Sequence, residues 1–202
     1  MLDAGCGSGH IAQRLGTTLD RADVVGLDVA DSRMVRDGHR FVASSGASMP
    51  FPDASFDAVV SNHVLEHVGT FDEQAAYLAE VRRVIAPTGI VYLAVPNRFR
   101  LVEAHFSLPL LSWFPSRVAN AYVRWTRRGT WYDVRPPTRR QLMRMLTSAG
   151  FDIDDRTPAA ARAAVGRIPV AGRVLGRIPT ACLRPLLLVV PTFVALARPT
   201  TT

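Results

Sequence analysis

The sequence predicts an α/β fold in which crossover helices cover a largely parallel β-sheet. Short apolar runs alternate with helical periods over the first 95 of the 202 residues, which is typical of strands joined by helices. Two capping patterns, Thr70 with Glu73 and Thr138 with Gln141, mark the starts of two helices. The apolar content of 48% and charged content of 20% are those of a globular protein and exclude a disordered chain.

The expected strands are short apolar runs bounded by turn residues. A first strand ends at Ala4, directly before a glycine-rich loop. The further strands are expected at 23–28, 41–43, 56–61, 89–95, 151–153 and 192–198.

Two helices have clear start and stop signals. The first is expected from about Asp72 to Ala86, where Pro87 ends it. The second begins after Pro137 and ends before Gly150, which stands where a left-handed residue often follows a helix. Its apolar side chains recur at helical spacing and are Leu142, Met145, Leu146 and Ala149.

Charge is divided unevenly along the chain. All 24 basic residues are arginine, and 1–95 carry seven of them with twelve acidic residues, whereas 96–202 carry seventeen with five. The basic half suits phosphates, anionic lipid or nucleic acid. The longest apolar run, 186–197, is too short to span a bilayer, and neither a leader pattern nor a disulfide framework is present, because Cys6 and Cys182 stand alone. We therefore expect a cytoplasmic protein with free thiols.

A long segment, 98–135, differs from the rest of the chain. It contains half of the sixteen aromatic residues, including all three tryptophans, together with seven arginines. Insertions of this length in compact α/β proteins are commonly lids or functional loops.

The glycine-rich loop carries Gly5, Gly7 and Gly9. Alternate glycines let the backbone turn closely under a ligand, and the helix that follows offers its positive end. The spacing is G-x-G-x-G and not the G-x-G-x-x-G of dinucleotide-binding proteins. With Asp3 before the loop and Asp28 ending the next strand, the set suits a nucleoside whose ribose hydroxyls bond a carboxylate.

Together with three further segments, this loop resembles the class I S-adenosylmethionine-dependent methyltransferases, of the small-molecule type (type 11) related to the ubiquinone and menaquinone methyltransferases. The resemblance covers residue 2 to about 96 and includes 49–57 (MPFPDASFD), 65–68 (LEHV) and 80–89 (EVRRVIAPTG). It implies a three-layer α/β/α Rossmann-like fold with a mostly parallel seven-stranded sheet and an antiparallel last strand. It also implies S-adenosylmethionine as cofactor and methyl transfer as the reaction.

The resemblance also implies how the chain is divided. We expect one domain, 1–202, with a cofactor-binding half at 1–97, a substrate cap at 98–137, and a C-terminal helix and last strands at 138–202. In the family, a helix and several strand residues precede the glycine loop, whereas here Met1 stands directly before Leu2. We therefore expect an N-terminally truncated fold in which Met1 is a wrongly assigned start.

Cofactor-binding roles carry over from the family to matching positions. Gly5, Gly7 and Gly9 would line the methionine and ribose parts of the cofactor, with Asp3 supporting the loop.

Beyond the loop, Asp28 would hold the ribose 2′ and 3′ hydroxyls, and Val29 would pack on the adenine. The alternative for Asp28 is the N-cap of a helix that follows it. Ser45, followed by Gly46, stands where the family usually has an aspartate that bonds the adenine amino group. Ser61 ends the fourth strand beneath the sulfonium, where backbone carbonyls would meet the methionine amine.

His63 and His67 are the candidate catalytic residues. Methyl transfer is an in-line displacement that needs alignment, and a hydroxyl acceptor also needs a base within hydrogen-bond reach. His63 ranks first because its position in this fold faces the methyl group, although a pocket-wall role for it stays open. For His67 a structural or substrate-facing role stays open, and His105 and Asp133 are further candidate bases.

A metal site at the same place is weighed separately. Some relatives bind a divalent metal through E-x-x-E-H, but this chain has HVLEH at 63–67, where an imidazole replaces the first carboxylate. Such side chains share one helical face and can converge on an ion. Because most relatives with a similar L-E-H-V segment bind no metal, we expect none here.

The aromatic and arginine-rich segment suggests the acceptor. Arginine pairs phosphate or carboxylate, and Trp and Tyr cover apolar groups, so we expect a small or lipid-linked amphipathic acceptor, methylated at oxygen. The alternative is a packed cap whose arginines face water. For the arginine-spaced stretch 159–184, the alternatives are a solvated helix and peripheral contact with an anionic membrane.

Two other functions are kept as alternatives. A nucleic-acid methyltransferase would suit the basic half, but SNHV at 61–64 stands in place of the N-P-P-Y-type motif and no added RNA-binding module is present. The other is a non-catalytic or inactive truncated protein of the same fold. Affinity for S-adenosylmethionine distinguishes an enzyme from an inactive protein.

Overall fold

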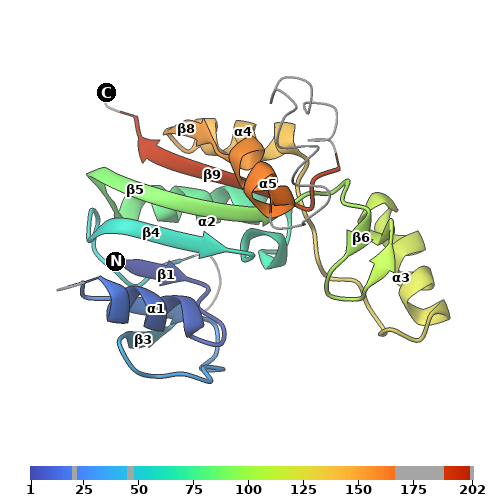
Figure 1. The fold of residues 1–202 in the computed structure, drawn as a ribbon, viewed down its shortest axis with the longest axis horizontal. Coiled ribbons are helices and arrows are strands. Elements are labelled where there is room, and N and C mark those ends of the chain that lie inside the picture. Colours follow the sequence, from blue (N-terminus) through green and yellow to red (C-terminus); the bar gives the residue numbers. More distant parts are fainter. Residues whose placement is uncertain (20–21, 45–47, 167–188, 201–202) are drawn as a thin grey trace.

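The computed structural model describes residues 1–19, 22–44, 48–166 and 189–200, and its strands form one main sheet. The strands are β1 (Leu2–Ala4), β2 (Val25–Asp28), β3 (Arg40–Ala43), β4 (Phe56–Asn62), β5 (Ile85–Pro96), β8 (Phe151–Asp155) and β9 (Thr192–Pro199). Their order in the sheet is β3-β2-β1-β4-β5-β9-β8 (Figure 1).

The sheet is parallel from β3 to β5 and antiparallel only around β9. β1 pairs in parallel with β2 and β4, and β4 pairs in parallel with β5. β9 runs antiparallel to both of its neighbours, β5 and β8. The expected seven-stranded, mostly parallel sheet with an antiparallel last strand is confirmed.

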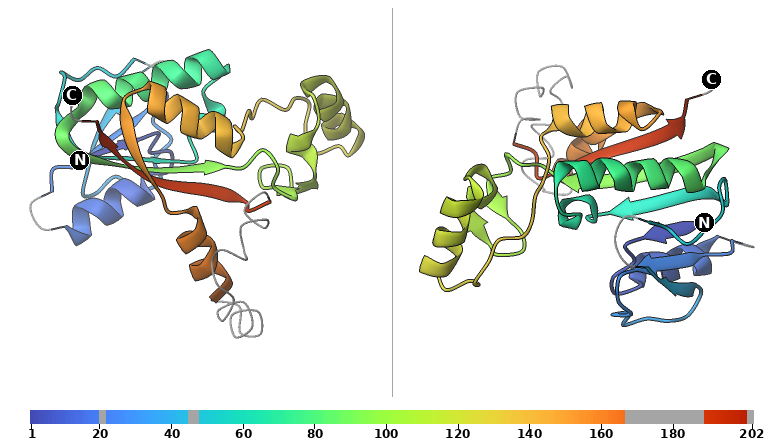
Figure 2. Two further views of the ribbon diagram at one scale, coloured as in Figure 1. Left: turned by 90° about the horizontal axis from the view of Figure 1, so that it is seen from above. Right: turned by 180° about the vertical axis from the view of Figure 1, so that it is seen from behind.

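Helices cover both faces of the sheet, which confirms the three-layer architecture. They are α1 (His10–Thr18), α2 (Phe71–Val84), α4 (Arg139–Ser148) and α5 (Thr157–Gly166). α2 and α4 lie on one face, and α1 and α5 lie on the other (Figure 2). Both predicted capping boxes are present, at Thr70 and Thr138. Among the helices of the described residues, none has the length and apolarity needed to cross a membrane.

Two elements differ from expectation. α2 ends at Val84 and not at Ala86, and β5 begins at once with Ile85, because a residue that precedes a proline, here Ala86, is disfavoured in helical conformation. The connection 29–39 between β2 and β3 contains no helix. The alternative role of Asp28 as a helix N-cap is therefore wrong.

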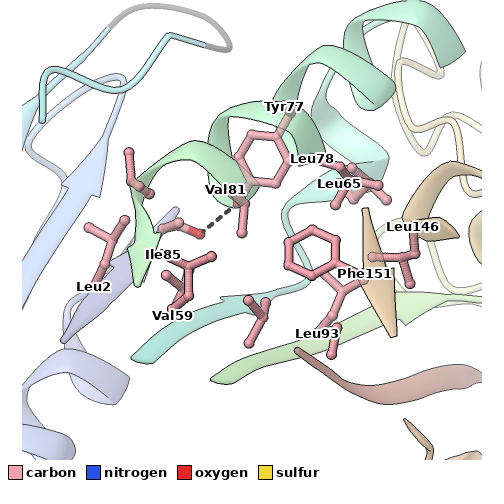
Figure 3. Close-up of a cluster of buried hydrophobic side chains, with 14 of the residues drawn as sticks. Leu2, Val59, Leu65, Tyr77, Leu78, Val81, Ile85, Leu93, Leu146 and Phe151 are labelled. Carbon is pink, nitrogen blue, oxygen red and sulfur yellow. Dashed lines mark hydrogen bonds between the residues drawn. The ribbon is translucent and has the colours of Figure 1, made fainter. Parts of the chain in front are cut away.

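The main core lies between the sheet and the α2/α4 layer (Figure 3). Leu2, Val59 and Leu93, from three adjacent strands, are at most 1% exposed. They pack in one cluster with the fully buried Leu78 and Val81 of α2. Removing apolar surface from water contributes about 20 to 33 cal/mol per Å². Burial of these side chains therefore holds the three strands against α2 and positions the loops at the carboxyl ends of β1, β2 and β4.

The aromatic and arginine-rich segment forms a small unit of its own beyond the carboxyl end of β5 (Figure 1). It comprises β6 (Val102–Glu103), β7 (Leu108–Pro109), the 3₁₀ turn η2 (Leu111–Trp113) and α3 (Ser116–Trp125). Its separate core consists of Leu108, Leu111, Ala119, Val123, Tyr132 and Val134. The predicted insertion is therefore folded, and it lies at the sheet end where open α/β proteins bind ligands.

Candidate functional site

The glycine-rich loop joins β1 to α1 and depends on left-handed backbone. Gly5, Gly7 and Gly9 have φ of 84°, 47° and 83°. A Cβ on Gly5 would stand 2.3 Å from a methyl of Val64, and one on Gly9 would stand 2.5 Å from the Val35 carbonyl oxygen. Beside Gly7 no atom lies within 4 Å of that position, so the loop is closely packed at its two ends and open at its centre.

Asp28 faces the open centre of this loop. Its Oδ2 accepts a hydrogen bond from the Gly7 amide at 2.8 Å, and its Oδ1 accepts one from the Val29 amide at 2.7 Å. Each carboxylate oxygen keeps a further lone pair. The Val29 side chain is 70% exposed. The structure thus brings a carboxylate, open backbone and an uncovered apolar side chain to one place.

Two other predicted residues, Asp3 and Ser61, are buried beside the loop. Burial raises the pKa of Asp3 to about 6, and its Oδ2 has no hydrogen-bond partner in the described residues. The Ser61 hydroxyl lies 2.9 Å from that of Tyr77, which also reaches the Ala4 carbonyl at 3.4 Å. The Ser61 side chain therefore ties β4 to α2.

Ser45 and Gly46, predicted near the adenine, lie outside the described residues, as do Cys182 and most of 159–184. Cys6, the other thiol, is buried and free.

His63 follows β4 in a strained conformation. Its φ is 57°, in the left-handed region that non-glycine residues rarely adopt. The backbone is held there by the bond from its amide to the Ala94 carbonyl at 2.9 Å. Strain of this kind is concentrated at functional sites. The side chain stays 39% exposed at the carboxyl end of the sheet.

Glu66 is the centre of a cluster of imidazoles. It is fully buried in the 3₁₀ turn η1 (Leu65–His67). Its Oε1 lies 3.4 Å from His63 Nδ1 and 4.0 Å from His67 Nε2, and neither of its carboxylate oxygens has a hydrogen-bond partner in the described chain. The carboxylate is placed to stabilise a positive charge on either histidine.

His105, from the insertion, completes the cluster. Its ring meets that of His67 edge to face, with 5.0 Å between centroids. Its Nδ1 lies 2.8 Å from Oε1 of Glu103, which is fully buried and also pairs with Arg100. Burial and the Arg100 charge lower the pKa of His105, which favours its neutral form.

Sequence reasoning missed the roles of Glu66, Glu103 and Arg100. The position of Glu66 between two histidines was a signal for the first of them. Glu103 and Arg100 carried no such signal in the sequence, because their partners come together only when the insertion folds. Asp133, considered as a base, lines a pocket beside the insertion.

Glu66, His67 and His105 also form a geometric candidate for a metal site. One ligand atom from each lies within 4.8 Å of the others, and imidazole with carboxylate suits zinc and similar ions. A tetrahedral zinc at about 2.1 Å from its ligands would hold them roughly 3.4 Å apart. The 4.0 Å between Glu66 and His67 is wider than that, so the absence of a metal stays our prediction.

Comparisons with known proteins match the part of the chain that contains the glycine-rich loop and, for two relatives, extend beyond it. Residues 2–93 match the family described as a methyltransferase domain. A probable S-adenosylmethionine-dependent methyltransferase of Mycolicibacterium smegmatis is 29% identical over 160 residues, which are 77% of this chain and 52% of that protein. A ubiquinone biosynthesis O-methyltransferase of Rhizobium leguminosarum is 26% identical over 164 residues, which are 78% of this chain and 60% of that protein. The chain spans about half the length of the first of these relatives.

Solved structures show the same fold. That of an S-adenosylmethionine-dependent methyltransferase from Mesorhizobium loti superposes with a TM-score of 0.64 at 18% identity, over 98% of this chain and 89% of that one.

Proposed function

We propose that this chain, whose residues 2–93 match the family described as a methyltransferase domain, transfers a methyl group from S-adenosylmethionine to an oxygen of a small or lipid-linked amphipathic acceptor. The observation that carries the proposal is the open side of Gly7 beside the Asp28 carboxylate and the exposed Val29. When bound, the cofactor supplies the methyl group on a positively charged sulfur atom.

The loop residues fit that cofactor. The remaining lone pairs of Asp28 would accept the ribose 2′ and 3′ hydroxyls, and Val29 would cover the adenine. The open space at Gly7 has room for the ribose and methionine parts, which a side chain would fill. Asp3 has an oxygen without a partner in the described chain and would support the loop from below.

His63 and His67 would handle the acceptor's proton. An imidazole nitrogen at either position would take the proton of the acceptor hydroxyl, and the buried Glu66 would stabilise the imidazolium that forms. His105, whose pKa is lowered, would stay neutral beside His67. The insertion would exclude water from this cluster.

The acceptor class is supported by the composition of the insertion and by the similarity to the Rhizobium relative, a ubiquinone biosynthesis O-methyltransferase. The proposal also includes the division into a cofactor half, a cap and a C-terminal part, and a cytoplasmic location. For 159–184, contact with an anionic membrane stays the alternative to a solvated helix.

Calorimetric titration with S-adenosylhomocysteine tests cofactor binding. We expect micromolar affinity for the intact chain and loss of binding in Asp28→Ala, because the carboxylate is removed. Asp152→Ala, in which an exposed aspartate of β8 is replaced, is the matched control and should bind normally. Absence of binding by the intact chain would contradict the proposal.

Transfer itself is measured with isotopically labelled S-adenosylmethionine and a panel of phenolic and lipid-linked acceptors, with mass spectrometry to locate the label on oxygen, carbon or nitrogen. Binding without transfer to any acceptor class would favour the non-catalytic alternative. Transfer to RNA or DNA alone would favour the nucleic-acid alternative.

A further inference from the structure

A pocket of about 360 Å³ lies between the start of α2 and the insertion. Its volume is in the range of small-molecule sites. Thr70 lines the side formed by α2, and the insertion contributes Arg98, Phe114, Trp131, Tyr132 and Arg135 to the wall.

The pocket is next to the imidazole cluster. Thr70 follows His67 by three residues, and the Arg135 amide donates a hydrogen bond to the Glu66 carbonyl at 2.8 Å. The Gln74 side chain bonds the Arg135 carbonyl at 2.9 Å and fixes this wall to α2. A molecule seated in the pocket would therefore have the cluster as its neighbour.

The charged groups of the pocket favour an anion. Arg98 and Arg135 contribute two guanidinium groups, and within the described chain neither makes a side-chain hydrogen bond or an ion pair. The pKa of Glu73 is lowered mainly by its hydrogen bonds from Thr70, and the Arg135 charge makes a smaller contribution. Asp133 is the one carboxylate of the lining, so positive charge predominates. A guanidinium binds phosphate or carboxylate through two parallel hydrogen bonds.

Tyr132 adds a donor without a partner. Its side chain is 8% exposed, and its hydroxyl has no hydrogen-bond partner among the residues described. Leaving a buried hydroxyl without a hydrogen bond is unfavourable. Burial raises its pKa to about 12, and Arg100 and Arg98 act in the opposite direction. The hydroxyl stays protonated; because it has no exposed surface in this structure, it would donate to a bound oxyanion only after the ring shifts toward the pocket.

Aromatic side chains supply the apolar part of the pocket. Trp131 is 63% exposed and Phe114 is 38% exposed, and both line it. Phe114 also meets the Tyr122 ring at 6.0 Å, so it is held in place by α3. Uncovered aromatic rings beside cationic groups suit an apolar or aromatic body that carries an anionic group.

We propose that this pocket binds the anionic group of the acceptor, a phosphate or carboxylate joined to an apolar body, through Arg98, Arg135 and Tyr132. Its role in acceptor binding rests on the proposed methyl transfer, whereas binding of the anion does not. The apolar body would lie against Trp131 and Phe114, with the reacting oxygen directed toward the imidazole cluster.

Calorimetry with the full chain tests this site with three probes: phenyl phosphate, phenol and inorganic phosphate. We expect phenyl phosphate to bind at least tenfold more tightly than either of the others, because only it has both chemical parts. Arg98→Gln should weaken phenyl phosphate at least tenfold. Arg117→Gln, at an exposed position of α3 outside the pocket, is the matched control and should leave the affinity unchanged.

Tyr132→Phe separates the ligand role from a role in folding. It should weaken phenyl phosphate several-fold without lowering the melting temperature, because it removes only a hydroxyl that has no partner. Equal affinity for phenol and phenyl phosphate, or equal losses in the Arg98 and Arg117 variants, would overturn the proposal. Affinity for S-adenosylhomocysteine, measured on the same samples, should be the same in all variants, which separates failure of this site from failure of the proposed function.

Discussion

At the scale of single residues, the site is dominated by a buried carboxylate surrounded by imidazoles. Glu66 has no exposed surface; His63 lies 3.4 Å and His67 4.0 Å from its Oε1, and the Arg100 charge also acts on it electrostatically. Burying such a charge is costly without hydrogen bonds. A buried carboxylate in this position is consistent with a function that requires its negative charge. Stabilising a proton on the neighbouring histidines is such a function.

Glu66→Gln removes that charge and keeps the shape of the side chain. We expect the rate of methyl transfer to fall at least about tenfold, because the imidazolium formed at His63 or His67 loses its counter-charge. Single-turnover measurements with saturating cofactor check this. Affinity for S-adenosylhomocysteine and the melting temperature should not fall, and a variant with undiminished rate would contradict a role for Glu66.

Asp3 makes folding depend on pH in a specific direction. Its pKa is about 6 in the folded protein and near 3.9 in an unfolded chain. Between these values the folded state binds more protons than the unfolded state, so the free energy of unfolding falls as pH rises. The full difference is about 3 kcal/mol above pH 6.

Asp3→Asn should therefore raise the free energy of unfolding at pH 7 and flatten its slope between pH 4 and 6. Urea denaturation across that range measures both quantities. Asp152→Asn, at an exposed position, should change neither of them. An equal loss of stability at both ends of the range would show that the carboxylate is needed for packing.

Residues of the glycine loop could be predicted because their conformation is set locally, by glycine spacing and by the next strand. Asp28 is an example: it is expected beside the glycine-rich loop, and its carboxylate accepts a hydrogen bond from the Gly7 amide. The contact between His67 and His105 could not be predicted in this way. It joins η1 to an insertion whose fold depends on its own apolar contacts, and no periodicity in the sequence encodes that.

At the scale of elements, the loop between β1 and α1 separates structural glycines from a ligand-facing one. Gly5 and Gly9 have no room for a Cβ, whereas Gly7 has open space.

The helices show how far local sequence signals determine the elements. Both capping boxes form as predicted, but the 29–39 connection forms without the helix that alternation of strands and helices suggests. Asp28, the N-cap candidate there, instead accepts hydrogen bonds from the Gly7 and Val29 amides.

Gly7→Ala should lower the affinity for S-adenosylhomocysteine at least tenfold, because the new methyl group enters the open space. Its cost in stability should be about 1–2 kcal/mol, that of a left-handed alanine. Gly38→Ala is the matched control, since Gly38 also has a positive φ, of 75°, and lies outside the loop. Calorimetry should show normal affinity for the control, and equal affinities of the two variants would exclude a cofactor beside Gly7.

At the scale of the whole molecule, two ligand regions are supported by two different cores. The cofactor loop rests on the main core, and the anion pocket rests partly on the small core of the insertion. Ligand binding at the cofactor loop and at the anion pocket can therefore be measured independently.

S-adenosylhomocysteine at one hundred times its dissociation constant should stabilise the fold by about 2.7 kcal/mol. For a chain of this size that corresponds to an increase of roughly 5–10 °C in melting temperature. Differential scanning calorimetry measures it, with homocysteine at the same concentration as control. Phenyl phosphate should add its own increase, and an unchanged melting temperature with saturating S-adenosylhomocysteine would contradict cofactor binding to the folded state.

The place of β9 in the sheet has a consequence for how the protein is made. β9 comes after every other strand described and yet stands between β5 and β8. During synthesis, β5 and β8 must therefore wait with unpaired edges until Thr192–Pro199 has left the ribosome. Unpaired strand edges attract other chains. Ribosome-bound intermediates that stop short of β9 are expected to need a chaperone, and a nascent chain gains protection only when its final strand closes the gap.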